Sequence, residues 1–422
     1  MDGRNRKRDV RLDIAVQAGR GASWLSPKLG RGGGSMIGGR VTLALDHSAL
    51  AKLAADLAVV LVSGTNGKTT TSHLLAAALR TIGPVAHNSA GANMSEGIVA
   101  ALSAHRSARF AVIEVDELHL GDVAKAVHPV AVVLLNLSRD QLDRGNEVRN
   151  VATRLSNALV QHPNTTVIAN ADDPMVVWAV HPAAHPLWVS AGVGWTGDVT
   201  VCPRCGRSLS MNQAQWACTC GLARPIPTWT AADGAAISGY TRIPVHLRLP
   251  GRFNLGNAVM AMAAAAVLGV EPGAAAAAMG AVDQVEGRYS TVRRGPHELQ
   301  LLLAKNPAGW AETLALIDPS HHLMVMINAR GADGRDTSWL WDVPFEQVRN
   351  RAVAVSGEHG ADIGLRLSYA GIEHVTVSDP LAAIEMLPPG KVDVVANYTA
   401  FHQLRRALAA APAPAANGGY GS

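Results

Sequence analysis

Apolar residues along the chain form short runs that alternate with longer stretches of helical spacing from residue 59 onward. Runs of this length suit strands that are buried on both faces, as when helices cover a parallel sheet. The predicted strands of the first half lie at residues 59–62, 111–115, 130–135 and 166–169. After the first of them, four apolar side chains share one helical face: Leu74, Leu75, Ala78 and Leu79. The pattern predicts an α/β fold built on a parallel sheet covered by helices.

A second α/β region begins near residue 299, with predicted strands at residues 323–327, 352–355, 374–377 and 392–396. Before it, residues 254–279 form an Ala-rich helical stretch whose longest apolar run is too short to cross a bilayer. We therefore expect a central domain and a C-terminal Rossmann-like α/β domain, followed by a disordered Ala/Pro/Gly-rich tail. Their expected bounds are residues 41–290, 295–408 and 409–422.

Two segments interrupt the alternation. Residues 21–40 are rich in glycine, and we expect them to be mostly loop. Residues 192–245 are rich in turn formers and hold all of the cysteines, which predicts an insertion into the central domain.

The net charge of +4 is distributed unevenly. Residues 1–40 contain nine Arg or Lys and three Asp, a net +6, so the rest of the chain, with 28 basic and 30 acidic residues, carries about −2. This basic, Gly-rich N-terminal segment could contact anionic lipid head groups or a phosphate-bearing substrate, or it could be a solvated arm. A low aromatic content and the lack of a reader motif argue against nucleic acid. The N-terminus lacks the apolar core of a signal peptide, so we expect a cytoplasmic protein.

The turn between the first strand and the first helix has the composition of a phosphate-binding loop. Its glycines let backbone N–H groups approach phosphate oxygens, and the helix N-terminus adds a favourable dipole. Lys68 can reach the β- and γ-phosphates, and the hydroxyl of Thr69 is placed to bind magnesium. The first glycine of the general pattern is absent, because Val62 stands there; a chance Gly-Lys-Thr in a tight turn is the alternative. The predicted nucleotide-binding residues of the loop are Gly64, Thr65, Asn66, Gly67, Lys68, Thr69 and Thr70.

Acidic residues follow three successive predicted strands, where ligands bind in doubly wound sheets. Glu114 ends one strand and is placed to hold magnesium. A single acid after a strand is usually a helix cap, but three such clusters in a protein with a phosphate loop favour a metal–nucleotide site. The other two clusters contain Asp140 with Asp143, and Asp172 with Asp173.

The four cysteines form two close pairs, each followed by a glycine that permits a tight turn. Such pairs suit tetrahedral thiolate coordination of zinc. Two disulfides or free thiols are the alternatives, and a cytosolic location disfavours disulfides. We predict a structural zinc ribbon over about residues 195–225, with no thiol left elsewhere as a nucleophile. Its ligands are Cys202, Cys205, Cys218 and Cys220.

Two further residues have a functional and an ordinary interpretation. Asn257 opens the Ala-rich helix, and its amide can pair with both the donor and the acceptor edge of adenine. Arg288 is a candidate phosphate ligand. Read alone, the first is part of a helix N-terminus and the second has no assigned role.

In order and spacing, these motifs resemble those of the Mur ligases and the related folylpolyglutamate synthases, over roughly residues 40–400. The matching residues are the phosphate loop, Glu114, Asn136, Asp140 to Asp143, Asn170 to Asp173, Gly251, Asn254, Asn257, Gly287 and Arg288. The resemblance implies that ATP activates a carboxylate as an acyl phosphate, which an amine attacks. It further implies that Lys68 contacts the transferred phosphate, Thr69 and Glu114 hold magnesium, Asn257 reads adenine and Arg288 contacts phosphate.

Three departures refine this resemblance. Only about 40 residues precede the ATPase core, so the usual UDP-sugar domain is missing. Gln141 stands where the family usually has a metal-associated histidine. No lysine occurs between Lys125 and Lys305, so the carbamylated lysine of many Mur ligases has no counterpart.

The cysteine insertion and the segment from Gly331 to Asp342 resemble the MurT subfamily across nearly the whole chain. The resemblance implies ATP-dependent amidation of the D-glutamate α-carboxylate in the stem peptide of lipid II. The ammonia would come from a GatD-type glutaminase subunit, in agreement with the absence of any cysteine outside the cluster. In this subfamily a C-terminal Asp is thought to complete the partner's Cys–His pair; Asp336 and Asp342 both fit, and Asp333 faces ATP in one alternative.

The acids beside Trp339 and Trp341 could instead have a purely structural role, as helix caps on a Trp-rich surface. For the whole chain, the alternatives to an amidating subunit are a stand-alone amino-acid ligase of the Mur or folylpolyglutamate type and a non-catalytic scaffold.

Overall fold

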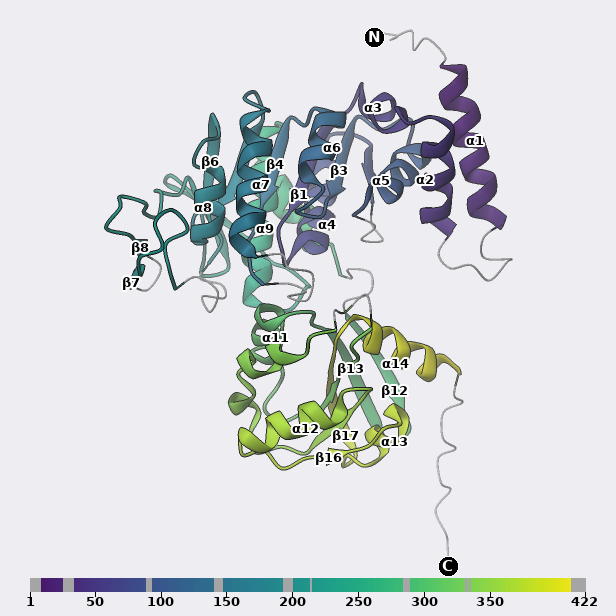
Figure 1. Ribbon diagram of the computed structural model, residues 1–422, viewed down its shortest axis with the longest axis vertical. Helices are drawn as coiled ribbons and strands as arrows, with labels where there is room; N and C mark the ends of the chain where they lie inside the picture. Colours follow the sequence, from purple (N-terminus) through teal and green to yellow (C-terminus); the bar gives the residue numbers. More distant parts are fainter. Residues whose placement is uncertain are drawn as a thin grey trace, which may run out of the picture. The chain divides into compact units, whose positions relative to one another are not determined.

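The computed structural model describes residues 9–25, 34–88, 93–139, 147–192, 200–212, 215–283, 289–330, 333 and 335–410. The chain divides into two compact units (Figure 1). The first comprises residues 1–137, 148–194 and 199–283, and the second comprises residues 138–147, 195–198 and 284–422.

The first unit is built on a nine-stranded sheet with the order β11-β10-β9-β6-β5-β4-β1-β3-β2. Every strand from β6 to β2 in this order runs parallel to its neighbours, and all four strands predicted for this half are present. The bounds are β1 (Ala58–Ser63), β2 (Val85–His87), β3 (Phe110–Glu114), β4 (Ala131–Leu134), β5 (Thr166–Asn170), β6 (His185–Ser190), β9 (Trp229–Ala232), β10 (Ala235–Ser238) and β11 (Thr241–Pro244).

Helices bury both faces of this sheet. Val59 and Leu61 of β1 belong to a core shared with one group of helices: α3 (Ala49–Ala54), α5 (Ser95–Ala104), α6 (Leu120–Val127), α7 (Val148–Val160) and α8 (Pro174–Val180). The alternate residues Val60 and Val62 are fully buried as well. Another group packs together, consisting of α4 (Lys68–Leu79), α9 (Arg252–Val267) and α10 (Pro272–Gly280), and α9 also contacts β4 and β5.

The prediction that residues 21–40 are mostly loop is wrong for residues 21–25 and 34–40, which the structure describes as helical. Two helices, α1 (Val10–Leu25) and α2 (Gly34–Leu45), lie here, and Figure 1 shows them packed side by side at the edge of the first unit. The glycines serve close helix packing rather than turns. A Cβ atom on Gly38 would lie 2.7 Å from the carbonyl oxygen of Gly19 in α1, and one on Gly39 would lie 1.7 Å from that of Glu96 in α5.

The insertion is smaller than expected. Residues 229–244, which we predicted to be part of it, form β9, β10 and β11 and extend the central sheet through antiparallel pairing of β9 with β10 and β10 with β11. Only a small hairpin of β7 (Ser210–Asn212) and β8 (Gln215–Ala217) stands apart. β9, β10 and β11 are each only four residues long, and their apolar pattern is weak. The many turn formers around them therefore led to the prediction of an insertion.

The Ala-rich stretch is helical and buried, as predicted, but it is divided into α9 and α10. Gly269 adopts φ +85°, and Pro272 opens α10 behind Glu271, whose side chain caps that helix. Among the residues described, no helix has the length and apolar character needed to cross a membrane.

The second unit contains a six-stranded sheet with the order β12-β13-β17-β14-β15-β16. β12 pairs antiparallel with β13, and the other strands are parallel to their neighbours, as expected for a Rossmann-like domain. One apolar core contains Trp310 and Phe345, and a second contains Phe401. The strands are β12 (Tyr289–Arg294), β13 (His297–Leu303), β14 (His322–Met326), β15 (Val353–Ser356), β16 (Val375–Thr376) and β17 (Gly390–Ala396). The helices are α11 (Pro307–Leu314), α12 (Gly360–Tyr369), α13 (Pro380–Glu385), α14 (Tyr398–Ala410) and two short 3-10 helices, η3 (Ser338–Asp342) and η4 (Phe345–Val348).

We predict that Gly39→Ala destabilises the protein through the contact between α2 and α5. The added Cβ would overlap a backbone carbonyl, so helices must move apart, at a cost of about 1–3 kcal/mol in the free energy of unfolding. Gly21→Ala is the matched control, because it also places Ala in a helix but meets nothing within 4 Å. Urea unfolding should show the control at or slightly above wild-type stability. Equal stability of the two variants would contradict the packing role of Gly39.

Candidate functional site

The phosphate-loop sequence lies in the predicted place, between the C-terminal end of β1 and the first residue of α4. Gly67 is the N-cap of α4 with φ +85°, and no side chain caps the helix. A Cβ at Gly67 would lie 2.6 Å from Oδ1 of Asn257, so the Asn257 side chain lies directly against the loop. The structure thus brings two elements of the predicted nucleotide site together, and the adenine-reading role of Asn257 stays a prediction.

Asn136, directly after β4, holds the loop through both its backbone and its side chain. Its carbonyl oxygen accepts from Thr65 N (2.9 Å), and its Oδ1 accepts from Asn66 N (2.9 Å). In return, its Nδ2 donates to the carbonyl oxygen of Asn66 (3.0 Å). The family resemblance includes Asn136 but implies no role for it. The signal that could have assigned one is the adjacency of β4 and β1, which sequence alone does not show.

The Lys68 side chain is buried and held within its own loop. Its Nζ donates to the carbonyl oxygens of Gly64 (2.5 Å) and Thr65 (3.3 Å) and pairs with Oε1 of Glu117 (3.3 Å). Only 8% of Lys68 is exposed. The ammonium group is therefore fixed at the loop, where a bound phosphate would meet it.

Glu114, at the end of β3, presents a carboxylate that fits a cation. The residue is 3% exposed, and its backbone exchanges two hydrogen bonds with the Asn88 side chain, at 2.8 and 2.9 Å. Its Oε2 has no hydrogen-bond partner among the residues described. A buried, unpartnered carboxylate oxygen is costly unless a cation meets it. Carboxylate and hydroxyl oxygens are ligands that Mg²⁺ prefers, so Glu114 and the predicted ligand Thr69 suit this ion.

His87, at the end of β2, is a residue of this site that we did not predict. Its Nε2 lies 3.0 Å from the hydroxyl of Ser72 in α4, and that hydroxyl donates to the carbonyl oxygen of Thr69 (2.9 Å). Burial lowers the pKa of His87 to about 3, so the ring is neutral at physiological pH. His87 therefore supports the first turn of α4 as a neutral hydrogen-bond donor and adds no positive charge near the loop.

The third predicted acidic cluster has structural roles in place of the expected metal–nucleotide role. Asp173 caps α8 by accepting from the N–H groups of Met175 (2.8 Å) and Val176 (3.1 Å). Asp172 forms an ion pair with Arg224 at 2.7 Å, and both side chains are almost fully buried. Asp140, Gln141, Asp143, Gly287 and Arg288 lie outside the described residues.

The four cysteine Sγ atoms all lie within 4.8 Å of one another. The Sγ atoms of Cys202 and Cys220 are 3.6 Å apart, and those of Cys205 and Cys218 are 3.5 Å apart. No disulfide joins them. A tetrahedral zinc site with Zn–S bonds of about 2.3 Å needs Sγ atoms about 3.8 Å apart, so the cluster could hold this metal.

Backbone turns shape the cluster as predicted from the two Cys–Gly patterns. Gly206 and Gly221 adopt φ +74° and +88°. A hydrogen bond from the backbone N–H of Cys220 lowers the pKa of the Cys218 thiol to about 6, whereas burial raises the pKa of Cys202 to about 11. A dication bound among the four sulfur atoms would stabilise the thiolate form of both cysteines.

The segment with the four cysteines and the β7–β8 hairpin, residues 200–224, is here called the cysteine module. Buried polar contacts anchor it to the central sheet. Trp216 of β8 donates its indole N–H to the carbonyl oxygen of Ala171, next to β5 (3.2 Å). The side chains of Trp216 and Leu222 pack with Val177 of α8 in a small apolar cluster. Together with the ion pair between Asp172 and Arg224, these contacts fix the module to the end of β5.

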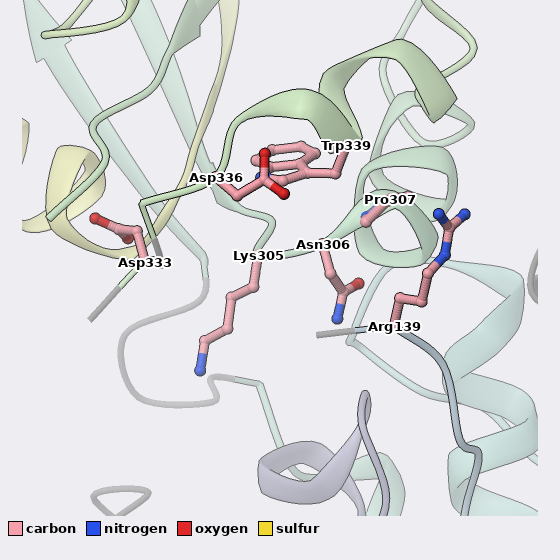
Figure 2. Close-up of a pocket in the computed structure, with 7 residues that line it drawn as sticks. All are labelled: Arg139, Lys305, Asn306, Pro307, Asp333, Asp336 and Trp339. Carbon is pink, nitrogen blue, oxygen red and sulfur yellow. The ribbon is translucent and has the colours of Figure 1, made fainter. Parts of the chain in front are cut away.

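In the second unit, the predicted acids Asp333 and Asp336 line one pocket (Figure 2). Asp333 accepts from the backbone N–H of Thr399 (3.0 Å) and from its hydroxyl. Asp336 accepts from the backbone N–H of Ser338 (2.8 Å), a bond that lowers its pKa. The pocket is lined by Arg139, Lys305, Asn306, Pro307, Asp333, Asp336 and Trp339. The lining thus includes one lysine, one arginine and two aspartates.

Asp342, the third candidate acid, ends η3 and forms an ion pair with Arg139 at 3.1 Å. The preceding Trp341 is 51% exposed and stacks edge-on with Tyr369, which is 74% exposed. The aromatic surface predicted beside these acids is therefore present at Trp341, whereas Trp339 is buried in the core.

Two family models match the chain. Residues 62–192 match the Mur ligase middle domain, and residues 303–401 match the MurT ligase C-terminal domain. The first match contains the phosphate loop and Glu114, and the second contains the three candidate acids.

Curated relatives match over most of the chain. It is 29% identical over 438 residues to the lipid II isoglutaminyl synthase (glutamine-hydrolyzing) subunit MurT of Streptococcus pneumoniae, covering 95% of this chain and 98% of the relative. It is 31% identical over 375 residues to the subunit of the same name from Staphylococcus aureus strain N315, covering 81% and 84%. Among solved structures, MurF from Acinetobacter baumannii has a TM-score of 0.66 at 16% identity, over 88% of this chain and 80% of that chain. This likeness shows the fold.

We predict about one zinc ion per chain, measured by elemental analysis of the purified protein. Cys202→Ser should remove the ion and lower the melting temperature, because structural metal sites contribute folding energy. Met211→Ser, an exposed position in the same hairpin outside the cluster, is the control and should keep both. Metal-free protein with unchanged stability would refute the assignment.

Proposed function

Because the chain belongs to the MurT family of Mur ligase-like enzymes, we propose that it is the ATP-dependent subunit of a lipid II isoglutaminyl synthase. The chain is a ligase with a Mur ligase fold. The match to MurT subunits over most of the chain carries this proposal, and the geometry of the phosphate loop supports it.

The proposed reaction converts the α-carboxylate of D-glutamate in the lipid II stem peptide into an amide. The carboxylate oxygen attacks the γ-phosphorus of ATP, giving an acyl phosphate and ADP. Ammonia then attacks the acyl carbon, and phosphate leaves as the amide forms and a proton is lost. The product contains D-isoglutamine, and the step belongs to peptidoglycan synthesis.

The residues of the first unit supply positioning and charge for phosphoryl transfer. Lys68 places a fixed ammonium group where negative charge develops on the transferred phosphoryl group. Glu114 and Thr69 would hold magnesium, which when bound neutralises charge on the phosphates. Asn136 keeps the loop backbone in place through the bonds to Thr65 and Asn66, so the groups are arranged before ATP arrives.

The ammonia source in this proposal is a separate GatD-type glutaminase subunit. Glutaminases of one class use a cysteine nucleophile, and all four cysteines of this chain lie in one cluster. A cysteine nucleophile therefore has to come from another chain. Because lipid II is lipid-linked, we place the enzyme at the inner face of the membrane.

We further propose that the second unit lends a carboxylate to the partner's Cys–His pair. Asp336 is ionised and lies at a pocket, and Asp342 lies beside the exposed Trp341. Exposed aromatic side chains such as Trp341 and Tyr369 are typical of interface hot spots. Asp333 is the weaker candidate, because Thr399 already engages both of its oxygens.

The first test of the function is the phosphate loop. With the partner, lipid II and ATP present, Lys68→Ala and Glu114→Ala should each lower the amidation rate by about 10²-fold or more, since preorganised charge is lost. Lys125→Ala and Asp122→Ala, two exposed positions on α6 in the same unit, should keep wild-type rates. Near-normal rates for both Lys68→Ala and Glu114→Ala would contradict the ligase proposal.

The second test separates glutamine use from amide formation. Either Asp336→Asn or Asp342→Asn should abolish glutamine-dependent amidation and leave partner binding and ammonia-dependent amidation intact, because an orienting carboxylate is lost. Asp318→Asn is the matched control, since Asp318 also accepts from a backbone N–H two residues on, at 2.8 Å.

The same assay reports where each acid acts. Loss with both nitrogen sources would assign the acid to the ATP site, and loss of the complex would assign it to the interface. If neither variant loses glutamine use selectively, these positions do not share the partner's active site. The chain alone should use ammonia and should not hydrolyse glutamine.

A further inference from the structure

We propose that the outer face of α1 is a docking surface for an anionic membrane. The proposal deepens the proposed function and rests on it in one respect, namely that the substrate is lipid-linked. It assigns a binding role to a part of the chain that the catalytic proposal does not use.

The exposed side of α1 carries an apolar stripe along its length. Val10, Ile14, Trp24 and Leu25 are exposed by 65%, 62%, 65% and 48%. At 100° per residue these positions fall within an arc of about 100° on one side of the helix, with Gly21 and the exposed Gln17 between them and Ala18 at its border. Large apolar side chains exposed in this pattern, on a helix that is apolar on its inner side as well, form a surface that can enter an apolar medium.

The inner side of α1 is already occupied by the protein. Leu12, Ala15, Val16 and Gly19 are the buried residues, and α1 packs on α2, which in turn packs on α5. Figure 1 shows α1 at the edge of the first unit, with α2 between it and α5. The exposed stripe therefore faces away from the body of its own unit.

Positive charges border the stripe on both sides. Arg11 and Arg20 lie about 100° and 80° from Val10 in opposite directions around the helix. Among the described contacts, both guanidinium groups donate to neutral carbonyl oxygens, those of Leu45 (3.1 Å) and Ser103 (2.7 Å). They therefore keep their full charge at the border of the stripe.

The acid in α1 and the acid directly before it are both paired within the protein. Asp13 pairs with Arg106 at 2.8 Å, and Asp9 pairs with Lys52 at 2.7 Å. With these two acids paired, Arg11 and Arg20 leave the described surface of α1 positive, which complements a phosphate-rich membrane surface.

An apolar stripe bordered by cations on both sides is the pattern of a helix that lies in the plane of a membrane interface. The apolar side chains enter the acyl boundary, Trp24 suits the head-group level, and the arginines meet lipid phosphates. With 16 residues, α1 is about 24 Å long, enough to lie across several head groups. A second copy of the chain is the competing occupant, and positive charge on both copies would oppose it.

The test uses the full-length protein and sedimentation with vesicles of phosphatidylcholine, with or without phosphatidylglycerol. Wild type should bind the anionic vesicles and bind less as salt increases. The double variant Ile14→Gln, Trp24→Gln should bind at least about tenfold more weakly, since two apolar side chains no longer enter the membrane. Val160→Gln, at a position 55% exposed on α7, is the matched control and should bind as wild type.

Charge is tested separately. Arg11→Gln and Arg20→Gln should each weaken binding to anionic vesicles about fivefold and reduce its salt dependence, and Arg154→Gln, an exposed position on α7, should not. Circular dichroism and ammonia-dependent amidation of detergent-dispersed lipid II check that the variants remain folded and active.

Lack of vesicle binding by wild type, or equal binding by the double variant, would overturn the proposal. A wild-type dimer in analytical ultracentrifugation that the double variant loses would assign the stripe to a second copy and overturn it as well. Vesicle binding that depends on α1 in a protein without amidating activity would instead uphold the docking surface and count against the proposed function.

Discussion

The candidate site depends on the register of three neighbouring parallel strands, β4, β1 and β3, whose C-terminal ends lie side by side in the central sheet. Val62 of β1 pairs with Glu114 of β3, and Ser63 pairs with Leu134 of β4. The three strands therefore end at nearly the same level, and the residues that follow meet there. This register brings together a loop for phosphate, a buried carboxylate and the amide of Asn136, although they are far apart in the sequence. The position of β1 between β3 and β4 also makes this edge a switch point of the sheet, where ligands of such folds bind.

Long-range pairing also explains which parts of the fold and the site could be predicted from sequence. The central strands were predictable because helices cover both faces of the sheet, so that nearly every residue of such a strand is apolar. Leu61 of β1 and Ile113 of β3, for example, lie within continuous apolar runs and are fully buried. The phosphate loop was predictable because its chemistry is local. The clamp by Asn136 was not, since it depends on which strand is the neighbour of β1.

The expected roles of the glycines in α2 and of the acids after β5 were wrong for a physical reason. Each expectation followed from the local preference of the residue type, whereas contacts in the folded protein determine the role. Gly38 and Gly39 favour turns in isolation, yet each lies in a helix where a side chain would strike a neighbouring carbonyl oxygen. Asp172 and Asp173 looked like ligands after a strand, but Arg224 and the first turn of α8 use them. The partners of Gly38, Gly39 and Asp172 lie in other segments, which periodicity and composition do not identify, whereas Asp173 caps the helix that follows it directly.

The contacts of Lys68 have a consequence for the energetics of nucleotide turnover. A lysine side chain normally loses about 2 kcal/mol of rotamer entropy when it is fixed. Here that loss has already occurred, because two loop carbonyls and Glu117 hold the ammonium group. An arriving phosphate does not order a mobile cation; it competes with an internal anion for one that is in place. In the proposed reaction, Lys68 would exchange Glu117 for phosphate and return to Glu117 afterwards, which would limit the gain in ground-state binding and favour release of the spent nucleotide.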